Sequence, residues 1–151
     1  MTARNFVRLA LAGGVSLAAF AAPALAQMNP VGLWRSVDDK SGEAKAEIRI
    51  TDSGGALRGQ IVKTVKKDAK PDAVCTECSD ERKGQPIAGL EIIRGGKQAE
   101  GKEVWEGGKI LDPENGKEYR ASFTPIDGGR KLEVRGFLGP FWRTQTWVRV
   151  E

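Results

Sequence analysis

The chain has 151 residues, with 24 basic and 20 acidic side chains, a formal net charge of +4 and no histidine. The absence of histidine excludes the Ser-His-Asp and Cys-His arrangements of nucleophilic enzymes and leaves few ligands for zinc. No glycine-rich phosphate loop precedes a helical pattern, so we expect no catalytic residues, no metal and no cofactor, and an enzyme is the minority interpretation.

Residues 1–26 have the three parts of a cleavable secretory signal peptide. Arg4 and Arg8 form a basic start, residues 9–22 form an apolar stretch, and Ala24-Leu25-Ala26 offers small residues for the cleavage site. A membrane-spanning helix needs about 20 apolar residues, and this stretch is shorter. We expect export to the periplasm or secretion from a Gram-negative-type cell, with no transmembrane segment left after cleavage.

Cleavage leaves residues 27–151 as one domain and removes two arginines, so that 22 basic residues face 20 acidic ones. This near balance, together with the lack of a basic run interleaved with aromatic residues, argues against a nucleic-acid partner. The remaining length fits a single hydrophobic core.

Short segments that alternate between apolar and polar residues follow one another along this domain, separated by turn sequences. In the clearest segment, Ala46, Ile48 and Ile50 share one face while Glu47 and Arg49 share the other. No segment has a helical period, which argues against a parallel α/β sheet. The pattern predicts about eight strands, at residues 33–37, 44–50, 57–65, 90–93, 105–111, 117–123, 131–136 and 143–150.

Eight short antiparallel strands in sequence favour an all-β fold, an up-and-down barrel, because closing the sheet removes its exposed edges. A two-sheet sandwich is the competing fold, but the connections are mostly of hairpin length. The interior of an eight-stranded barrel is either filled with side chains or holds one small ligand. Gly59, Gly107 and Gly108 lie within predicted strands and mark either bulges or space inside the barrel.

Residues 66–86 form one long and highly charged connection without a strand pattern. A connection of this length is either a lid or binding loop or a solvated excursion, and both interpretations remain open. It contains Cys75 and Cys78, for which export to an oxidising compartment predicts a local disulfide. The Cys-x-x-Cys spacing is also that of thiol–disulfide enzymes, although no helix is predicted to follow the first cysteine.

Trp34 lies near the start of the domain and several arginines lie near its end. In a closed barrel the first and last strands are neighbours, so Arg143 or Arg149 could lie over the Trp34 ring. Simple burial of Trp34 in the core is the alternative. The sequence Gly32-x-Trp34 with a C-terminal arginine resembles the structural signature of lipocalins and related calycins, which implies a lipocalin-like barrel.

Longer stretches resemble the bacterial domain-of-unknown-function family 2147, a family of small exported proteins. The matching residues are Gly32, Trp34, residues 83–90, residues 105–113, Asn115-Gly116-Lys117, Tyr119, Arg135-Gly136, Gly139 and residues 143–147. The resemblance covers almost all of the predicted mature chain. It implies export and a β-rich domain and supplies no activity.

We therefore expect an exported envelope protein that binds a small apolar or amphipathic ligand inside a β-barrel. Trp105, Tyr119 and Phe123 are the predicted pocket walls. Lys63 is in phase with Ile61 and is predicted to supply a counter-charge near the rim, unless a bulge turns it to solvent.

Two other functions remain open at this point. A filled barrel would suit a non-enzymatic module that binds an envelope protein partner through residues 66–86. A thiol–disulfide enzyme would use Cys75 and Cys78.

Overall fold

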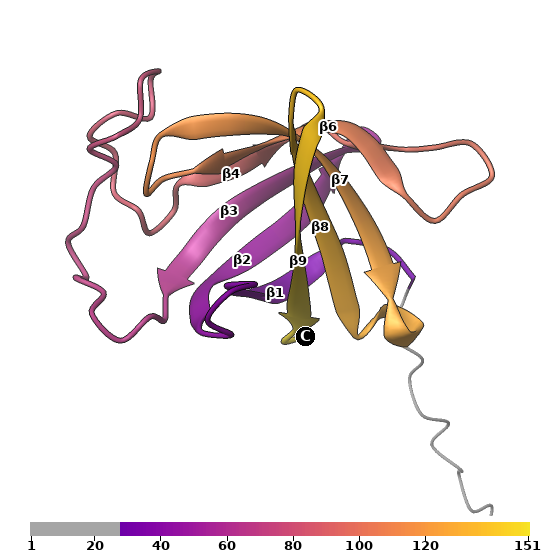
Figure 1. Cartoon of the computed structure of the whole chain (residues 1–151), viewed down its shortest axis with the longest axis horizontal. Coiled ribbons are helices and arrows are strands. Elements are labelled where there is room, and N and C mark those ends of the chain that lie inside the picture. Colours follow the sequence, from indigo (N-terminus) through magenta and orange to yellow (C-terminus); the bar gives the residue numbers. More distant parts are fainter. Residues whose placement is uncertain (1–27) are drawn as a thin grey trace, which may run out of the picture.

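The computed structural model describes residues 28–151, which form a closed β-barrel of eight antiparallel strands with one further short strand (Figure 1). The predicted signal peptide at residues 1–26 lies outside the described residues. Within residues 28–151 there is no helix of the length and apolar character needed to cross a membrane. The elements are β1 Gly32–Val37, β2 Ala44–Ser53, β3 Ala56–Thr64, β4 Glu91–Arg94, β5 Lys97–Gln98, β6 Trp105–Asp112, β7 Lys117–Ile126, the 3-10 turn η1 Asp127–Gly129, β8 Lys131–Leu138 and β9 Phe141–Arg149.

The strands pair in the order β4-β3-β2-β1-β9-β8-β7-β6-β5, and β4 also pairs with β6, which closes the ring. The first and last strands meet with Trp34 opposite Arg149. The β4–β6 ladder is short, with Ile93 opposite Ile110 and Arg94 opposite Lys109. The predicted all-β, up-and-down barrel is therefore confirmed. The short strand β5 was not predicted, because two residues are too few to show an alternation.

The alternation in the sequence decides which side chains lie inside the barrel. In β2, Ala46, Ile48 and Ile50 are buried in the interior, as predicted. Glu47 is on the outer face, yet it is also buried, because Arg35 and Lys63 cover it through ion pairs of 2.7 and 3.3 Å. The hydrogen bond from Arg35 holds the pKa of Glu47 below its ordinary value.

Gly59, Gly107 and Gly108, for which the sequence predicted bulges or free space, serve two different purposes. Gly107 has φ of +70° and lies where the β6–β7 register shifts between Trp105 and Gly108, so it forms a bulge. A Cβ at Gly59 would lie 2.7 Å from the Ile93 side chain, and one at Gly108 would lie 3.1 Å from the Phe123 ring. Gly59 and Gly108 therefore allow close packing and do not provide free space.

The interior divides into two halves along the barrel axis. One end, which we call the closed half, is filled with side chains that are at most 1% exposed, namely Trp34, Ile50, Leu57, Ile93, Phe123 and Leu132. The other end, which we call the open half, contains a cavity that opens between residues 66–86, the β6–β7 turn and the β8–β9 hairpin. Figure 1 shows residues 66–86 as a wide loop at one end of the barrel.

Candidate functional site

The cavity of the open half has a volume of about 600 Å³. Small-molecule sites typically have volumes of about 300–1,000 Å³. The inward positions of most of the strands supply its apolar wall, because alternate residues of a barrel strand face the interior. These wall residues include Ala46, Ile48, Ile61, Ile92, Leu111, Val134 and Trp147.

The polar groups in the wall are already paired with protein atoms. The Ser36 hydroxyl donates to the Ala46 carbonyl oxygen at 3.2 Å and accepts from the Ala46 N–H at 3.1 Å. The Trp147 indole N–H donates to the Gln145 side-chain oxygen at 3.0 Å. Among residues 28–151, no buried side-chain nitrogen or oxygen lacks a hydrogen-bond partner. The wall therefore presents mainly apolar surface to anything inside it.

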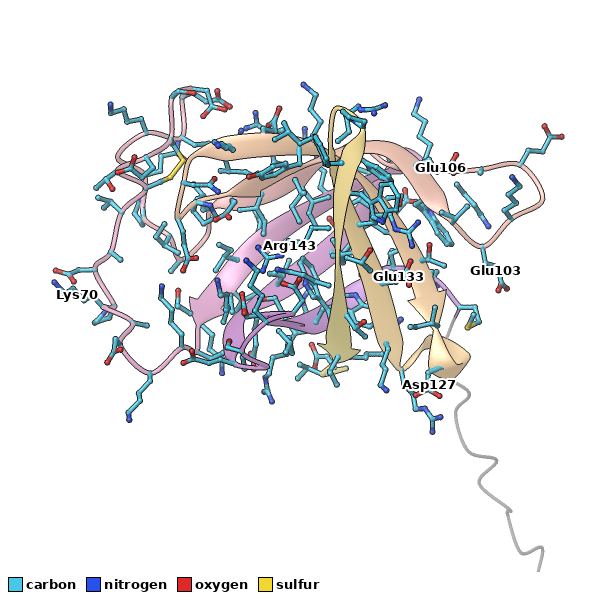
Figure 2. The ribbon with its side chains drawn as sticks, viewed as in Figure 1. Lys70, Glu103, Glu106, Asp127, Glu133 and Arg143 are labelled. Carbon is cyan, nitrogen blue, oxygen red and sulfur yellow. A yellow bond between two sulfur atoms is a disulfide. The ribbon has the colours of Figure 1, made fainter. Side chains whose placement is uncertain are left out.

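Charged side chains surround the mouth of the cavity and pair with one another. Glu114 accepts hydrogen bonds from Lys66 at 2.7 Å and from Lys45 at 2.9 Å, and these two lysines lower its pKa. Arg143 lies beside β9 (Figure 2), and its Nε donates to Asp39 of the β1–β2 turn at 2.7 Å, which lowers the pKa of that carboxyl. The mouth is therefore polar and nearly balanced in charge.

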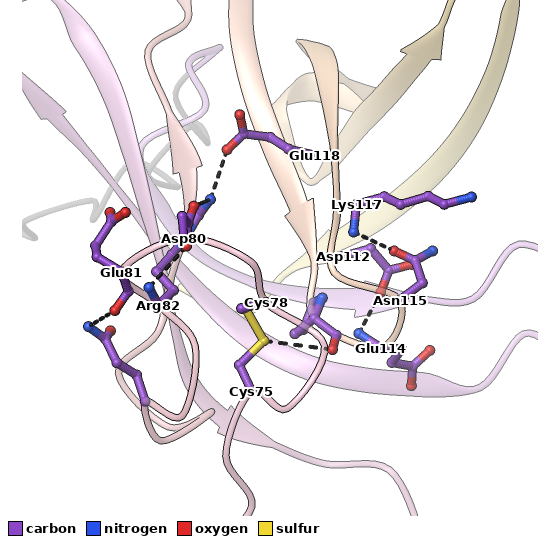
Figure 3. The surroundings of a disulfide bond; sticks show 12 residues. Cys75, Cys78, Asp80, Glu81, Arg82, Asp112, Glu114, Asn115, Lys117 and Glu118 are labelled. Carbon is purple, nitrogen blue, oxygen red and sulfur yellow. Dashed lines mark hydrogen bonds and ion pairs between the residues drawn. A yellow bond between two sulfur atoms is a disulfide. The ribbon is translucent and has the colours of Figure 1, made fainter.

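The loop of residues 66–86 borders the mouth and is attached to the barrel at several points. Its segment 68–73 contributes to the lining of the cavity. Cys75 and Cys78 form the predicted disulfide, and both cysteines are buried (Figure 3). The Cys75 sulfur lies 3.9 Å from the Pro113 carbonyl oxygen of the β6–β7 turn. A Cβ on Gly116, in the same turn, would overlap the backbone of Glu77, so the loop lies directly on this turn.

A buried arginine forms the second attachment of this loop. Arg82 is 2% exposed and donates to Asp80 at 2.5 Å, to Glu118 of β7 at 2.9 Å and to the Glu91 carbonyl oxygen of β4 at 3.1 Å. Hydrogen bonds from Arg82 lower the pKa of Asp80 to about 2. Sequence reasoning missed this residue, because Arg82 looks like any other charge in a run of charged residues.

The predicted pocket residues are not all in the cavity. Tyr119 lines it, whereas Trp105, Phe123 and Lys63 are not among its lining residues. Phe123 is buried in the closed half, and Trp105 lies opposite it across the β6–β7 ladder. A bulge after Ile61 turns Lys63 to the outer face, where it lies 3.3 Å from Glu47 and is 60% exposed.

The opposite end of the barrel is closed by Trp34 and Arg149. The Arg149 guanidinium lies 4.1 Å from the centre of the Trp34 ring and donates to the carbonyl oxygens of Val31, Asn29 and Gly129 at 2.6–2.8 Å. Burial lowers the pKa of Arg149. A Cβ on Gly32 would lie 2.4 Å from this guanidinium, which explains the glycine in the Gly-x-Trp pattern. Of the two predicted arginines, Arg149 therefore lies over Trp34, and Arg143 lies at the mouth.

One feature of the mouth was not predicted at all. The apex of the β8–β9 hairpin exposes Leu138, Phe141 and Trp142, which are 56%, 74% and 65% accessible to solvent. These side chains also line the outer part of the cavity. The uninterrupted run Phe-Leu-Gly-Pro-Phe-Trp at residues 137–142 was the available signal, because an exposed turn is normally polar.

Within residues 28–151, no group of three or more cysteine, aspartate or glutamate residues is placed to hold a metal ion. The two cysteine sulfurs are paired and buried, so a substrate thiol has no direct access to them. The geometry can enclose an apolar group and leave a polar group at the mouth.

Comparison with solved structures places the fold beside the lipocalins. Protein HP1028 from Helicobacter pylori, described as belonging to the lipocalin family, has a similar structure with a TM-score of 0.69 and 15% sequence identity. The match covers 83% of this chain and 85% of that protein. Comparison with curated proteins found no match. A family model matches residues 32–149, and the chain accordingly belongs to DUF2147, a family described as an uncharacterised protein conserved in bacteria.

Proposed function

We propose that this protein is an exported envelope protein that binds a small apolar or amphipathic ligand in the open half of its barrel. The observation that carries the proposal is the cavity of about 600 Å³ with its apolar wall. Burying apolar surface contributes roughly 25 cal/mol per Å², so an apolar ligand has a clear driving force to enter. Export to the periplasm or the medium is proposed from the signal-peptide pattern of residues 1–26.

The mouth favours a ligand with a polar end that is not strongly charged. Lys45 and Lys66 are engaged with Glu114, and Arg143 is engaged with Asp39. A free carboxylate or amine on the ligand would have to compete with these pairs. A neutral or zwitterionic polar group could instead exchange hydrogen bonds with them and remain in contact with water.

The two other functions that the sequence left open have less support. A protein-binding module with a filled barrel does not need a cavity, and side chains fill only the closed half. A thiol–disulfide enzyme needs an accessible sulfur, and Cys75 and Cys78 are at most 1% exposed. Ligand binding is the function that uses the cavity.

The decisive experiment is native mass spectrometry of the protein purified from the envelope of its own cell. A variant whose cavity is filled by a larger side chain is purified and measured in the same way. Gly136 lines the cavity, and a Cβ there would meet nothing nearer than Tyr119 at 3.6 Å, so Gly136→Trp should fold with its indole in the cavity. Lys131→Trp adds the same group on the outer face of the same strand and is the control.

We expect a bound small molecule on the wild type and on Lys131→Trp, and its loss from Gly136→Trp. A wild-type protein that carries no small molecule, and that also fails to bind the uncharged fluorophore N-phenyl-1-naphthylamine, would contradict ligand binding. Cell fractionation with N-terminal sequencing would test export, because cleavage before Gln27 is expected.

A further inference from the structure

We propose that the apex of the β8–β9 hairpin, residues 137–142, docks the protein on a lipid bilayer and places the mouth of the cavity at the membrane surface. The ligand would then be an amphiphile that passes between bilayer and barrel. This second statement rests on the proposed function, whereas docking itself does not. Figure 1 shows this turn as a narrow loop that projects beyond the neighbouring strands.

The composition of the hairpin changes with distance from its tip. At the tip, Leu138 lies opposite Phe141, and Phe137 lies opposite Trp142. The next two pairs hold the arginines, with Gly136 opposite Arg143 and Arg135 opposite Thr144. Arg143 pairs with Asp39 of the β1–β2 turn, and Arg135 pairs with Glu133 of β8. An apolar tip followed by paired charges matches the order in which a bilayer presents acyl chains and zwitterionic headgroups.

The dimensions agree with this order. A strand rises about 3.3 Å per residue, so the arginines lie roughly 7–13 Å behind the tip of the turn. Interfacial segments bury their apolar face about 5–10 Å into the headgroup and acyl boundary. Trp142 would lie at the depth where tryptophan is enriched in membrane proteins. The arginine side chains are long enough to stay among the headgroups.

A protein partner fits this surface less well. The exposed apolar residues of the apex, Leu138, Phe141 and Trp142, sit on a single turn. A stable protein interface buries about 800 Å² on each side and involves about 20–30 residues. A bilayer deforms around a projection and needs no complementary pocket. Insertion of a few side chains gives weak and reversible attachment, which suits a protein that must leave the membrane again.

The apex is also continuous with the proposed ligand site. Leu138, Phe141 and Trp142 line the outer part of the same cavity whose inner wall contains Val134 and Trp147. An acyl chain that leaves the bilayer at the apex would therefore meet apolar surface along its path into the barrel, with less exposure to water.

The test uses the mature protein with vesicles of phosphatidylcholine, alone or with added phosphatidylglycerol, and reads the tryptophan fluorescence. Trp142 is 65% exposed, whereas Trp34, Trp105 and Trp147 are at most 7% exposed. Because Trp147 lines the cavity, the part of the fluorescence change that is lost in Trp142→Phe reports the apex. We expect a blue shift, quenching by brominated lipid tails and co-sedimentation with the vesicles.

Leu138→Ser with Phe141→Ser removes apolar groups and leaves Trp142 as the reporter. The partition coefficient onto vesicles should fall about tenfold or more per side chain. Val62→Ser with Val148→Ser is the matched control, because these valines are 47% and 45% exposed elsewhere on the barrel, and it should bind as the wild type does.

Three results would overturn membrane docking. The wild-type protein could fail to bind vesicles. The apex variant could bind vesicles as well as the wild type does. The protein could also self-associate and bury Trp142 in the absence of lipid. The proposed function is tested separately, with N-phenyl-1-naphthylamine in lipid-free buffer. Gly136→Trp should lose binding of this fluorophore and keep vesicle binding, so failure of the proposed function and failure of membrane docking are distinguishable.

Discussion

The closed and open halves of this barrel are built from the same eight strands, yet one half is packed and the other holds a cavity. Each strand contributes inward residues to both halves, as β7 does with Phe123 in the closed half and Tyr119 in the open half. The fold therefore does not decide whether the interior is occupied. The size of the inward side chain at each level of the barrel decides it.

The glycines illustrate this difference most directly. Gly59 lies in the closed half, where the Ile93 side chain occupies the space that its own side chain would fill. Gly136 lies in the open half, where a Cβ would meet only Tyr119, at an ordinary contact distance of 3.6 Å. In the first case glycine allows a neighbour to pack closely, and in the second it enlarges the cavity.

Each half also contains an arginine that is held in place, but the partners differ. Arg149 of the closed half lies over Trp34 and donates to backbone carbonyl oxygens. Arg82 of the open half binds the carboxylates of Asp80 and Glu118. We expect the attachment of the open half to depend on pH through these carboxylates, since they titrate in the acid range and carbonyl oxygens do not.

The largest expected difference between the halves is in the response to loss of a tryptophan. Trp34→Ala should lower the free energy of unfolding by about 3–5 kcal/mol, because it empties a fully buried site and removes the surface under Arg149. Trp142→Ala should change it by less than about 0.5 kcal/mol, because this side chain is exposed. Chemical denaturation of both variants measures the difference, and equal losses would contradict the division into halves.

Loss of Arg82 should have the next largest effect. Arg82→Met should cost about 3 kcal/mol, near the lower end for breaking a buried ion pair, because Asp80 and Glu118 retain some contact with water. Denaturation at neutral pH tests this value. Lys109→Met, which removes an exposed partner of the same Glu118, is the control and should cost less than about 1 kcal/mol.

Alanine substitutions at the two glycines should differ in stability by a smaller amount than the Arg82 and Lys109 variants do. Gly59→Ala should cost about 1–3 kcal/mol, because the new methyl group would collide with Ile93. Gly136→Ala should be neutral or slightly stabilising, because there is room for the methyl group and the unfolded chain loses entropy. Thermal denaturation of the Gly59→Ala and Gly136→Ala variants measures this difference. A destabilised Gly136→Ala variant would show that the open half is more tightly packed than described.

Acid should produce the smallest and most gradual effect. The pKa of Asp80 is lowered from 3.8 to about 2, and the pKa values of Glu114 and Asp39 are also lowered. A lowered pKa in the folded state adds stability above the unfolded value, and this stability is lost as pH falls through the folded value. The free energy of unfolding should therefore decline below about pH 4.5, and the decline should be shallower in Arg82→Met.

The sequence predicted the barrel well because alternation is a local property. Eight of the nine strands of residues 28–151 were recognisable from neighbours such as Ala46, Ile48 and Ile50, and the Gly-x-Trp pattern with a late arginine agreed with closure of the ring. The cavity was harder to predict, because it depends on which side chains share a level after the strands have paired. Phe123 and Tyr119 are four residues apart on one face, and only Tyr119 lines the cavity.

Two features outside the cavity were also hard to predict from the sequence. Lys63 is in phase with Ile61, but one inserted residue in β3 reverses its direction. Nothing in the composition of residues 66–86 distinguishes the buried Arg82 from its exposed neighbours, because its partners Glu91 and Glu118 come from other strands.

The short ladder between β4 and β6 has a consequence for how the barrel fluctuates. A closed ring of strands opens first where the fewest hydrogen bonds must break. The β4–β6 and β1–β9 ladders each join two residue pairs, but Leu33 adds backbone hydrogen bonds with Val150 and Glu151 beside the β1–β9 ladder. The amides of β4 and β6 should therefore exchange with deuterium sooner than those of the long β8–β9 ladder. Arg82 bridges β4 and β7 across this seam, so its removal should accelerate exchange there while β8 and β9 keep their protection.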